Sequence, residues 1–227
     1  VVALHEVARD RATTATVALA IAAAAKPWAV VFAPLAAVPP GERRLVRPAL
    51  AAGAAVATWL PFLVAEPDTL DTSDFGIRND PTSSLRALGI DDPTTPGWVR
   101  TAQLVGGLLL VGLVVLVLRR WPAAVLAGIT WRLLLDPGVH RYYTVGWVIG
   151  ALVVELRARP GRVPWRTAAG AVVLELTAVP DVPVGPAQFA RLAVLLTSLA
   201  AVVRTLPATA TRRRPDPRSS APSPTST

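Results

Sequence analysis

Long apolar runs constrain this chain more than any other feature of its sequence. Residues 98–118 form the cleanest run and end at Arg119 and Arg120. A helix of about 20 apolar residues crosses a hydrocarbon core roughly 30 Å thick. Because such runs fill most of the 227 residues, we predict an all-α, polytopic membrane helix bundle of about seven hydrophobic segments. The predicted segments are residues 13–38, 48–65, 98–118, 121–135, 142–156, 165–179 and 187–206.

The charges indicate how these segments are oriented. The chain has 23 Lys and Arg against 15 Asp and Glu, and most basic residues lie in short gaps between apolar runs. Basic loops prefer the cytoplasmic side of a membrane, so the acidic stretch 66–97 is predicted to lie outside. We therefore predict a multi-pass plasma-membrane protein with one membrane domain, residues 1–206. Residues 207–227, rich in Arg, Pro, Ser and Thr, are predicted to form a disordered cytoplasmic tail.

The first segment is interrupted at Lys26-Pro27. Proline removes a helical hydrogen bond and clashes with the preceding turn, so the helix is expected to break there. A single kinked span would place one of the flanking arginine clusters outside. Two half-helices that turn at this point would keep both clusters inside, and we favour that re-entrant form.

Lys26 is also the first candidate binding residue. A lysine at the turn of a broken helix could bind a phosphate as a point charge; alternatively, it snorkels to the membrane interface. Arg132 and Asp136 are four residues apart, so on a helix they would share one face and could pair. That pair could bind substrate or be purely structural.

The sequence DPGVHRYY, residues 136–143, places several polar groups at the outer end of a hairpin. With Asp136, the candidates there are His140, Arg141 and Tyr143, which could grip a sugar or phosphate. An ordinary interfacial turn would use similar residues. The stretch 78–84 in the outer loop could likewise cap a site or simply be solvated.

Several function classes are not expected. The chain has 0 Cys and 2 His, so disulfides, thiolate nucleophiles and a His-based metal site are not predicted. No phosphate-binding glycine-rich loop or nucleophile elbow is present, and no cofactor is expected. Basic residues are not interleaved with aromatic stacking platforms, so nucleic-acid binding is not expected either.

Three stretches carry a resemblance to a known family. They are IAAAAKPWAVVFAPLAAVPPGERR (21–44), NDPTSSLRALG (79–89) and DPGVHRYYTVGWVIGAL (136–152). Together they resemble actinobacterial membrane glycosyltransferases of the GT-C superfamily, in the group of polyprenyl-phosphate-mannose-dependent mannosyltransferases (glycosyltransferase family 87). The resemblance implies transfer of mannose from a polyprenyl-phosphate donor to a cell-envelope glycan or glycolipid on the outer face of the membrane.

The same resemblance implies roles for particular residues. Lys26 would contact the lipid phosphate, and His140, Arg141 and Tyr143 would line the same cavity. The catalytic aspartate of such enzymes lies in an early outer loop. The similarity here begins just before the Lys-Pro motif, so the chain is expected to be a C-terminal part without that residue, and the catalytic base is unassigned.

Two other functions fit the sequence. A transporter or flippase component for lipid-linked intermediates would use Lys26, Arg132 and Asp136 along its path. A membrane assembly subunit would need no chemistry of its own.

Overall fold

The computed structural model describes residues 1–67, 77–179 and 182–204. This part of the chain is built from helices, and its only β pairing is one bridge between Arg78 and Thr94. The predicted tail 207–227 and the acidic residues Asp68, Asp71 and Asp74 lie outside the described residues. The elements, with η1 and η4 as 3-10 helices and η3 as a π-helical turn, are α1 (Val2–Ala8), α2 (Ala12–Ala25), η1 (Pro27–Ala37), α3 (Val46–Ala65), α4 (Ser84–Ala87), α5 (Trp98–Gly112), η3 (Leu113–Val117), η4 (Trp121–Ala123), α6 (Ala124–Leu134), α7 (Arg141–Ala158), α8 (Trp165–Leu176) and α9 (Val184–Arg204).

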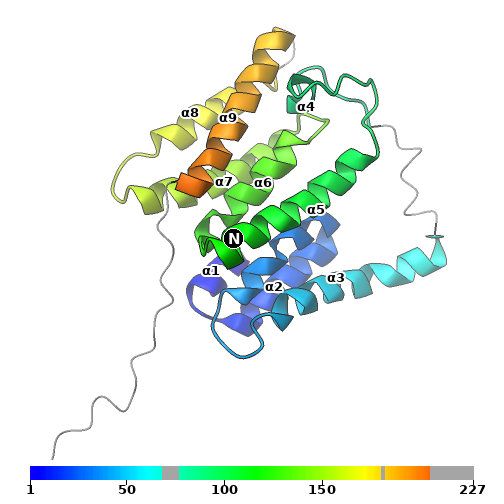
Figure 1. The fold of residues 1–227 in the computed structure, drawn as a ribbon, viewed down its shortest axis with the longest axis vertical. Helices are drawn as coiled ribbons and strands as arrows, with labels where there is room; N and C mark the ends of the chain where they lie inside the picture. Colours follow the sequence, from blue (N-terminus) through cyan, green and yellow to red (C-terminus); the bar gives the residue numbers. More distant parts are fainter. Residues whose placement is uncertain (68–76, 180–181, 205–227) are drawn as a thin grey trace, which may run out of the picture.

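The helices pack in two groups joined by α5 (Figure 1). In the first group α2 packs against α1, η1 and α3, and one core cluster contains Leu19, Ala33 and Ala51. In the second group α6 packs against α7 and α9, around a core that includes Leu133 and Trp147. Helix α5 contacts both η1 and α6, so residues of the two groups can meet along it.

The predicted break at Lys26-Pro27 is confirmed. Helix α2 ends at Ala25, and Lys26 is extended, with φ −144° and ψ 102°. A residue that precedes proline is driven out of the helical region by contact with the proline ring, which explains this conformation. The chain then turns back as η1, which packs alongside α2. The turn leaves Lys26 at the tip of a hairpin of two short helices.

Three helices are long and apolar enough to cross a membrane: Val46–Ala65, Trp98–Val117 and Val184–Arg204. Seven spans are not confirmed. The predicted segment 121–135 contains only η4 and the 11-residue α6, and segment 165–179 only the 12-residue α8. At 1.5 Å per residue such helices are about 15–18 Å long, well short of the hydrocarbon core. Helix α7 has 18 residues but carries Arg141, Glu155 and Arg157.

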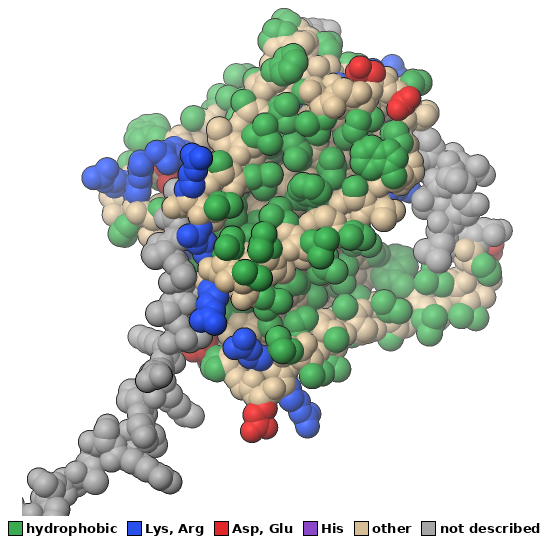
Figure 2. All heavy atoms as spheres, in the orientation of Figure 1, with side chains coloured by type: hydrophobic (Ala, Val, Ile, Leu, Met, Phe, Trp, Pro, Cys, Tyr) green, Lys and Arg blue, Asp and Glu red, His purple; other side chains and the backbone are tan. Residues whose placement is uncertain are grey.

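The outer surface is apolar, as expected for a protein solvated by lipid. Helix α3 exposes Leu50, Val56, Leu60, Phe62 and Val64, and hydrophobic side chains cover much of the face in Figure 2. Soluble monomers rarely expose contiguous apolar surface on this scale. Together with the three long helices, this surface indicates a membrane protein.

The basic segments gather at one end of the molecule, which we name the basic end. One core cluster brings together Val7, Ala36 and Trp121, which lie next to three basic segments of the sequence. The Arg157 guanidinium carbon lies 5.0 Å from the centroid of the Trp121 ring. Arg120 Nη1 donates to the carbonyl of Val202, near the end of α9. Most of the Lys and Arg side chains visible in Figure 2 lie along its left and lower parts.

Candidate functional site

The opposite end of the molecule brings Lys26 onto two tyrosines of α7. The Lys26 ammonium lies 4.6 Å from the ring centroid of Tyr143 and 4.9 Å from that of Tyr142. The two rings are themselves 4.2 Å apart. A cation at this distance from an aromatic face is attracted by the ring quadrupole. Lys26 and Tyr143, which the sequence analysis identified as candidate binding residues, are more than a hundred positions apart in the chain but lie together in the structure.

Arg132 of α6 reaches the same tyrosine. Its Nη2 donates to the Tyr143 hydroxyl at 3.3 Å, and its guanidinium carbon lies 5.2 Å from the Tyr143 ring centroid. Its Nη1 donates to the Oε1 atom of Gln103 on α5. The Gln103 Nε2 in turn donates to the carbonyl of Leu135, so both the nitrogen and the oxygen of the Gln103 amide are hydrogen-bonded. Gln103 thereby holds the arginine against the tyrosine.

We name Lys26, Arg132, Tyr142 and Tyr143 the cationic cluster. No ion pair in the described part of the chain involves either cation. Two like charges that share one aromatic partner repel each other. Such an arrangement is stabilised by an anion that binds between or beside the two charges, so the cluster is suited to bind one.

A cavity of about 340 Å³ adjoins the cluster. Arg132, Gln103 and Trp28 line it, together with Ile77 and Thr95 from the loop that follows α3. The Trp28 indole N–H and the Arg132 Nε are buried and have no hydrogen-bond partner among the described residues. Buried donors are nearly always paired, so the cavity is suited to a ligand or water with acceptor atoms.

The two remaining candidates, His140 and Arg141, lie at the start of α7 and make different contacts. His140 lies against the cluster, with its ring stacked on Tyr142 at 5.3 Å between centroids and 6.2 Å from Tyr143. Arg141 instead pairs with Glu175 of α8, at 3.7 Å between Nε and Oε2. Its prediction as a cavity residue therefore finds no support in its contacts.

Arg132 and Asp136 do not form the close ion pair that a continuous helix would allow. Helix α6 ends at Leu134, so Asp136 has left the helical face that carries Arg132, and the two form no ion pair. Asp136 is buried, and its Oδ1 accepts a hydrogen bond from the Gly138 N–H at 3.3 Å. Its Oδ2 has no partner among the described residues.

Burial raises the pKa of the Asp136 carboxyl above its ordinary value. The charges of Arg132, His140 and Arg191 act in the opposite direction but do not cancel the burial. Arg191, on α9, is itself buried and donates to the Thr177 hydroxyl at 3.5 Å. Asp136 and Arg191 are thus two buried groups of opposite charge that influence each other electrostatically without forming an ion pair.

Asp136→Asn is expected to stabilise the protein by about 1 kcal/mol at neutral pH, because it removes a buried charge that is only partly hydrogen-bonded. The folded-state pKa exceeds the unfolded-state pKa, so the wild type should lose stability as the pH rises through the folded value. The asparagine variant should lack this loss. Thermal unfolding in detergent from about pH 4 to about pH 8 measures it. Asp92→Asn, at an exposed position, is the control; the same profile for all three proteins would contradict the assignment.

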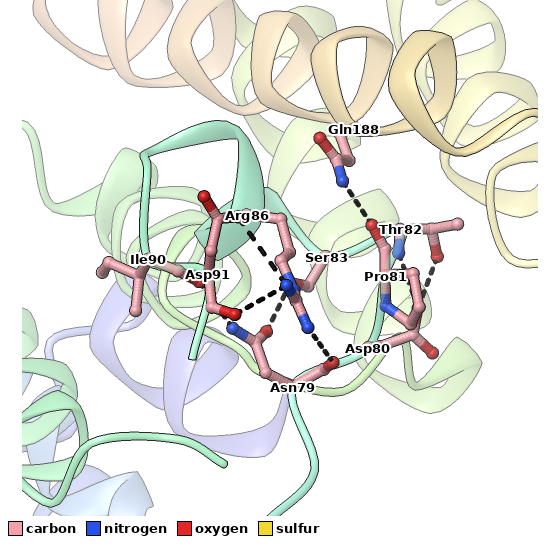
Figure 3. A network of polar contacts seen from close by, with 9 residues as sticks. All are labelled: Asn79, Asp80, Pro81, Thr82, Ser83, Arg86, Ile90, Asp91 and Gln188. Carbon is pink, nitrogen blue, oxygen red and sulfur yellow. Dashed lines mark hydrogen bonds and ion pairs between the residues drawn. The ribbon is translucent and has the colours of Figure 1, made fainter. Parts of the chain in front are cut away.

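Residues 77–97, which precede α5, are folded around one asparagine (Figure 3). The buried Asn79 donates from Nδ2 to the Ile90 carbonyl at 2.7 Å and accepts from the Ser83 hydroxyl at 2.8 Å. Arg86 donates to the Asp91 carbonyl at 2.7 Å and pairs with its carboxylate at 3.7 Å. These bonds close residues 79–91 into a compact unit that contains α4.

This loop is fastened to the helices that carry the site. The Ser84 hydroxyl donates to the Leu133 carbonyl at 2.8 Å, at the end of α6. The Asp80 N–H donates to the Pro137 carbonyl at 2.8 Å. Figure 3 shows a further bond, in which Gln188 of α9 donates to the Pro81 carbonyl. Ile77 and Thr95 of the same loop line the cavity beside Arg132, so these hydrogen bonds hold one wall of the cavity in place.

Asn79→Ala is expected to loosen this loop locally, at a cost of about 1–3 kcal/mol for the carbonyl and hydroxyl left without a partner. Limited proteolysis of the purified protein should then cut within residues 77–97 at least about tenfold faster than in the wild type. Asp92→Ala, which changes an exposed residue of the same loop, should leave the rate unchanged. Equal cutting rates for the wild type and Asn79→Ala would contradict the role of Asn79.

Sequence reasoning missed two site residues. Gln103 is a polar residue within an apolar span, and that position alone could have indicated a role. Trp28 directly follows the Lys-Pro break, which could have placed it beside Lys26. Among the described residues, no group of three His, Cys, Asp or Glu side chains could hold a metal ion.

Comparison with known proteins does not add to this description. No family model matches the chain. No significant similarity was found to a characterised protein or to a solved structure. The function is therefore argued from the residues of the site.

Proposed function

We propose that this chain is a glycosyltransferase-like membrane protein that binds a polyprenyl-phosphate sugar through the cationic cluster. In this proposal mannose passes from the lipid phosphate to a cell-envelope glycan or glycolipid acceptor. We further propose that seven hydrophobic segments of the bundle lie within the membrane, although α6 and α8 are each too short to cross it alone, and that the first segment is re-entrant. In this arrangement the cluster lies at the outer face and the tail in the cytoplasm.

The observation that carries the proposal is the convergence of Lys26 and Arg132 on Tyr143 without a carboxylate partner among the described ion pairs. A phosphate oxygen would supply the missing negative charge. Arginine offers N–H groups in a planar arrangement that matches phosphate, and lysine offers a compact charge. The apolar helices around the cluster suit a ligand whose remainder is hydrocarbon.

The cluster would act on the leaving group of the reaction. Transfer breaks the bond between the anomeric carbon and the phosphate oxygen, and the acceptor oxygen forms the new bond. Negative charge then develops on the departing phosphate, where Lys26 and Arg132 would stabilise it. The acceptor proton goes to a general base, which no residue of this chain is assigned to supply.

The proposal is tested by incubating membranes that contain the complete natural protein with radiolabelled polyprenyl-phosphate mannose. Label should enter a glycan or glycolipid in wild-type membranes and not in membranes lacking the protein. Movement of the lipid across proteoliposomes without glycan labelling would instead support a transporter. Neither activity, together with co-purification of a catalytic chain, would support an assembly subunit.

A further inference from the structure

A second cavity, of about 450 Å³, lies toward the basic end of the molecule, far along α7 from the cationic cluster. Its walls are Trp147 and Val154 of α7, Gly170 and Val173 of α8, and Val194 and Ala201 of α9. Helix α8 packs against both α7 and α9, and Figure 1 shows α8 beside α9. Most of the lining is apolar, and the volume lies within the range of about 300–1,000 Å³ that is typical of small-ligand sites.

The mouth of this cavity is basic. Arg159, just after α7, and Arg166, in the first turn of α8, both line it, and neither forms an ion pair with a described residue. Glu155 also lines the cavity, but its carboxylate accepts hydrogen bonds from the first residues of α8. One oxygen accepts from the Arg166 backbone N–H at 3.2 Å, and the other accepts from the Thr167 N–H and hydroxyl, both at 2.8 Å. The Glu155 carboxylate is thus hydrogen-bonded to α8, and among the described residues neither guanidinium group has a carboxylate at ion-pair distance, although the Glu155 charge still interacts with that of Arg166.

We propose that this groove binds an anionic phospholipid of the surrounding bilayer, with one acyl chain between α7, α8 and α9 and its phosphate at Arg159 and Arg166. Basic pockets between membrane helices recognise anionic head groups in this way. Charge complementarity selects this occupant over two others. The chain's own tail carries Arg212, Arg213 and Arg214, and a second copy would bring the same arginines, so both would be repelled.

The test is native mass spectrometry of the full chain in detergent, titrated with phosphatidylglycerol and with phosphatidylcholine of the same acyl chains. One phosphatidylglycerol should bind with at least about tenfold preference. Arg166→Gln should lower its affinity about fivefold, the typical effect of one basic residue at an anionic surface. Arg162 is an exposed arginine of the loop between α7 and α8 and does not line the groove, so Arg162→Gln should change the affinity less than about twofold.

A second pair of variants tests the groove itself. Ala169→Phe fills the lining, whereas Ala168→Phe places the same ring at an exposed position that does not line it. Only the first should lower the binding of both lipids. Equal affinity for the two lipids, equal effects of Arg162→Gln and Arg166→Gln, or dimer formation abolished by Ala169→Phe with lipid binding unchanged would overturn the proposal. Lys26 does not line this groove, so Lys26→Ala should leave phosphatidylglycerol binding intact. This result would distinguish the groove from the proposed site of sugar transfer.

Discussion

Lys26→Ala is expected to lower mannosyl transfer by at least about 100-fold while the protein still inserts and folds. Removing one preorganised group that stabilises developing negative charge typically costs about 100- to 1,000-fold in rate. The side chain is exposed at a hairpin tip, so its truncation leaves no cavity in the core. The measurement is glycan labelling by membranes that contain equal amounts of wild type and variant.

Two controls separate a specific role from a general effect of charge. Lys26→Arg keeps the charge and should retain at least about a tenth of the activity, given the different shape of the guanidinium group. Arg44→Ala removes an exposed cation from the segment between η1 and α3, on the side of the basic end, and should have little effect. Full activity of Lys26→Ala would exclude Lys26 from the proposed phosphate site.

Gly150→Ala is expected to destabilise the protein by about 2–3 kcal/mol through steric overlap between α7 and α6. A Cβ atom at this position would lie 2.6 Å from the backbone nitrogen of Leu126. Backbone atoms cannot rotate away as a flexible side chain can, so one of the two helices must shift. Small residues at such crossings are what allow membrane helices to approach closely.

The matched control is the same substitution at Gly53 of α3, where a Cβ would meet no atom within 4 Å. Since alanine is a better helix former than glycine, Gly53→Ala should stabilise by up to about 1 kcal/mol. Thermal unfolding in detergent measures both variants. If Gly150→Ala were as stable as Gly53→Ala, the described contact between α6 and α7 would be wrong.

Local rules in the sequence predicted the break at Lys26 and the apolar helices. Proline acts on its immediate neighbours, so the extended conformation of Lys26 follows from Pro27 alone. The apolar runs likewise locate helices, because they reflect composition within one segment. Lys26 and Tyr143 were assigned to one cavity through a family resemblance, and the structure brings them within 4.6 Å. Their role there is still a prediction.

Features that depend on where a helix ends, or on contacts between distant segments, were not predicted. The Arg132–Asp136 pairing assumed that α6 continues, but it ends at Leu134. Gln103 meets Arg132 across 29 residues of sequence, and no periodicity encodes that contact. The fold of residues 79–91 depends on the side chain of Asn79, which a composition rich in turn residues does not single out.

The most direct test of the account is whether the cationic cluster recognises a lipid phosphate. Polyprenyl phosphate and the corresponding unphosphorylated polyprenol would be titrated against the full chain in nanodiscs of neutral lipid, with the wild type compared with Arg132→Gln. We predict that the wild type binds the phosphate at least about 100-fold more tightly than the alcohol. Arg132→Gln should lose at least about tenfold of that preference, the typical effect of one charge-assisted hydrogen bond. Equal binding of the two lipids by the wild type, or an unchanged preference in Arg132→Gln, would contradict the proposed phosphate site.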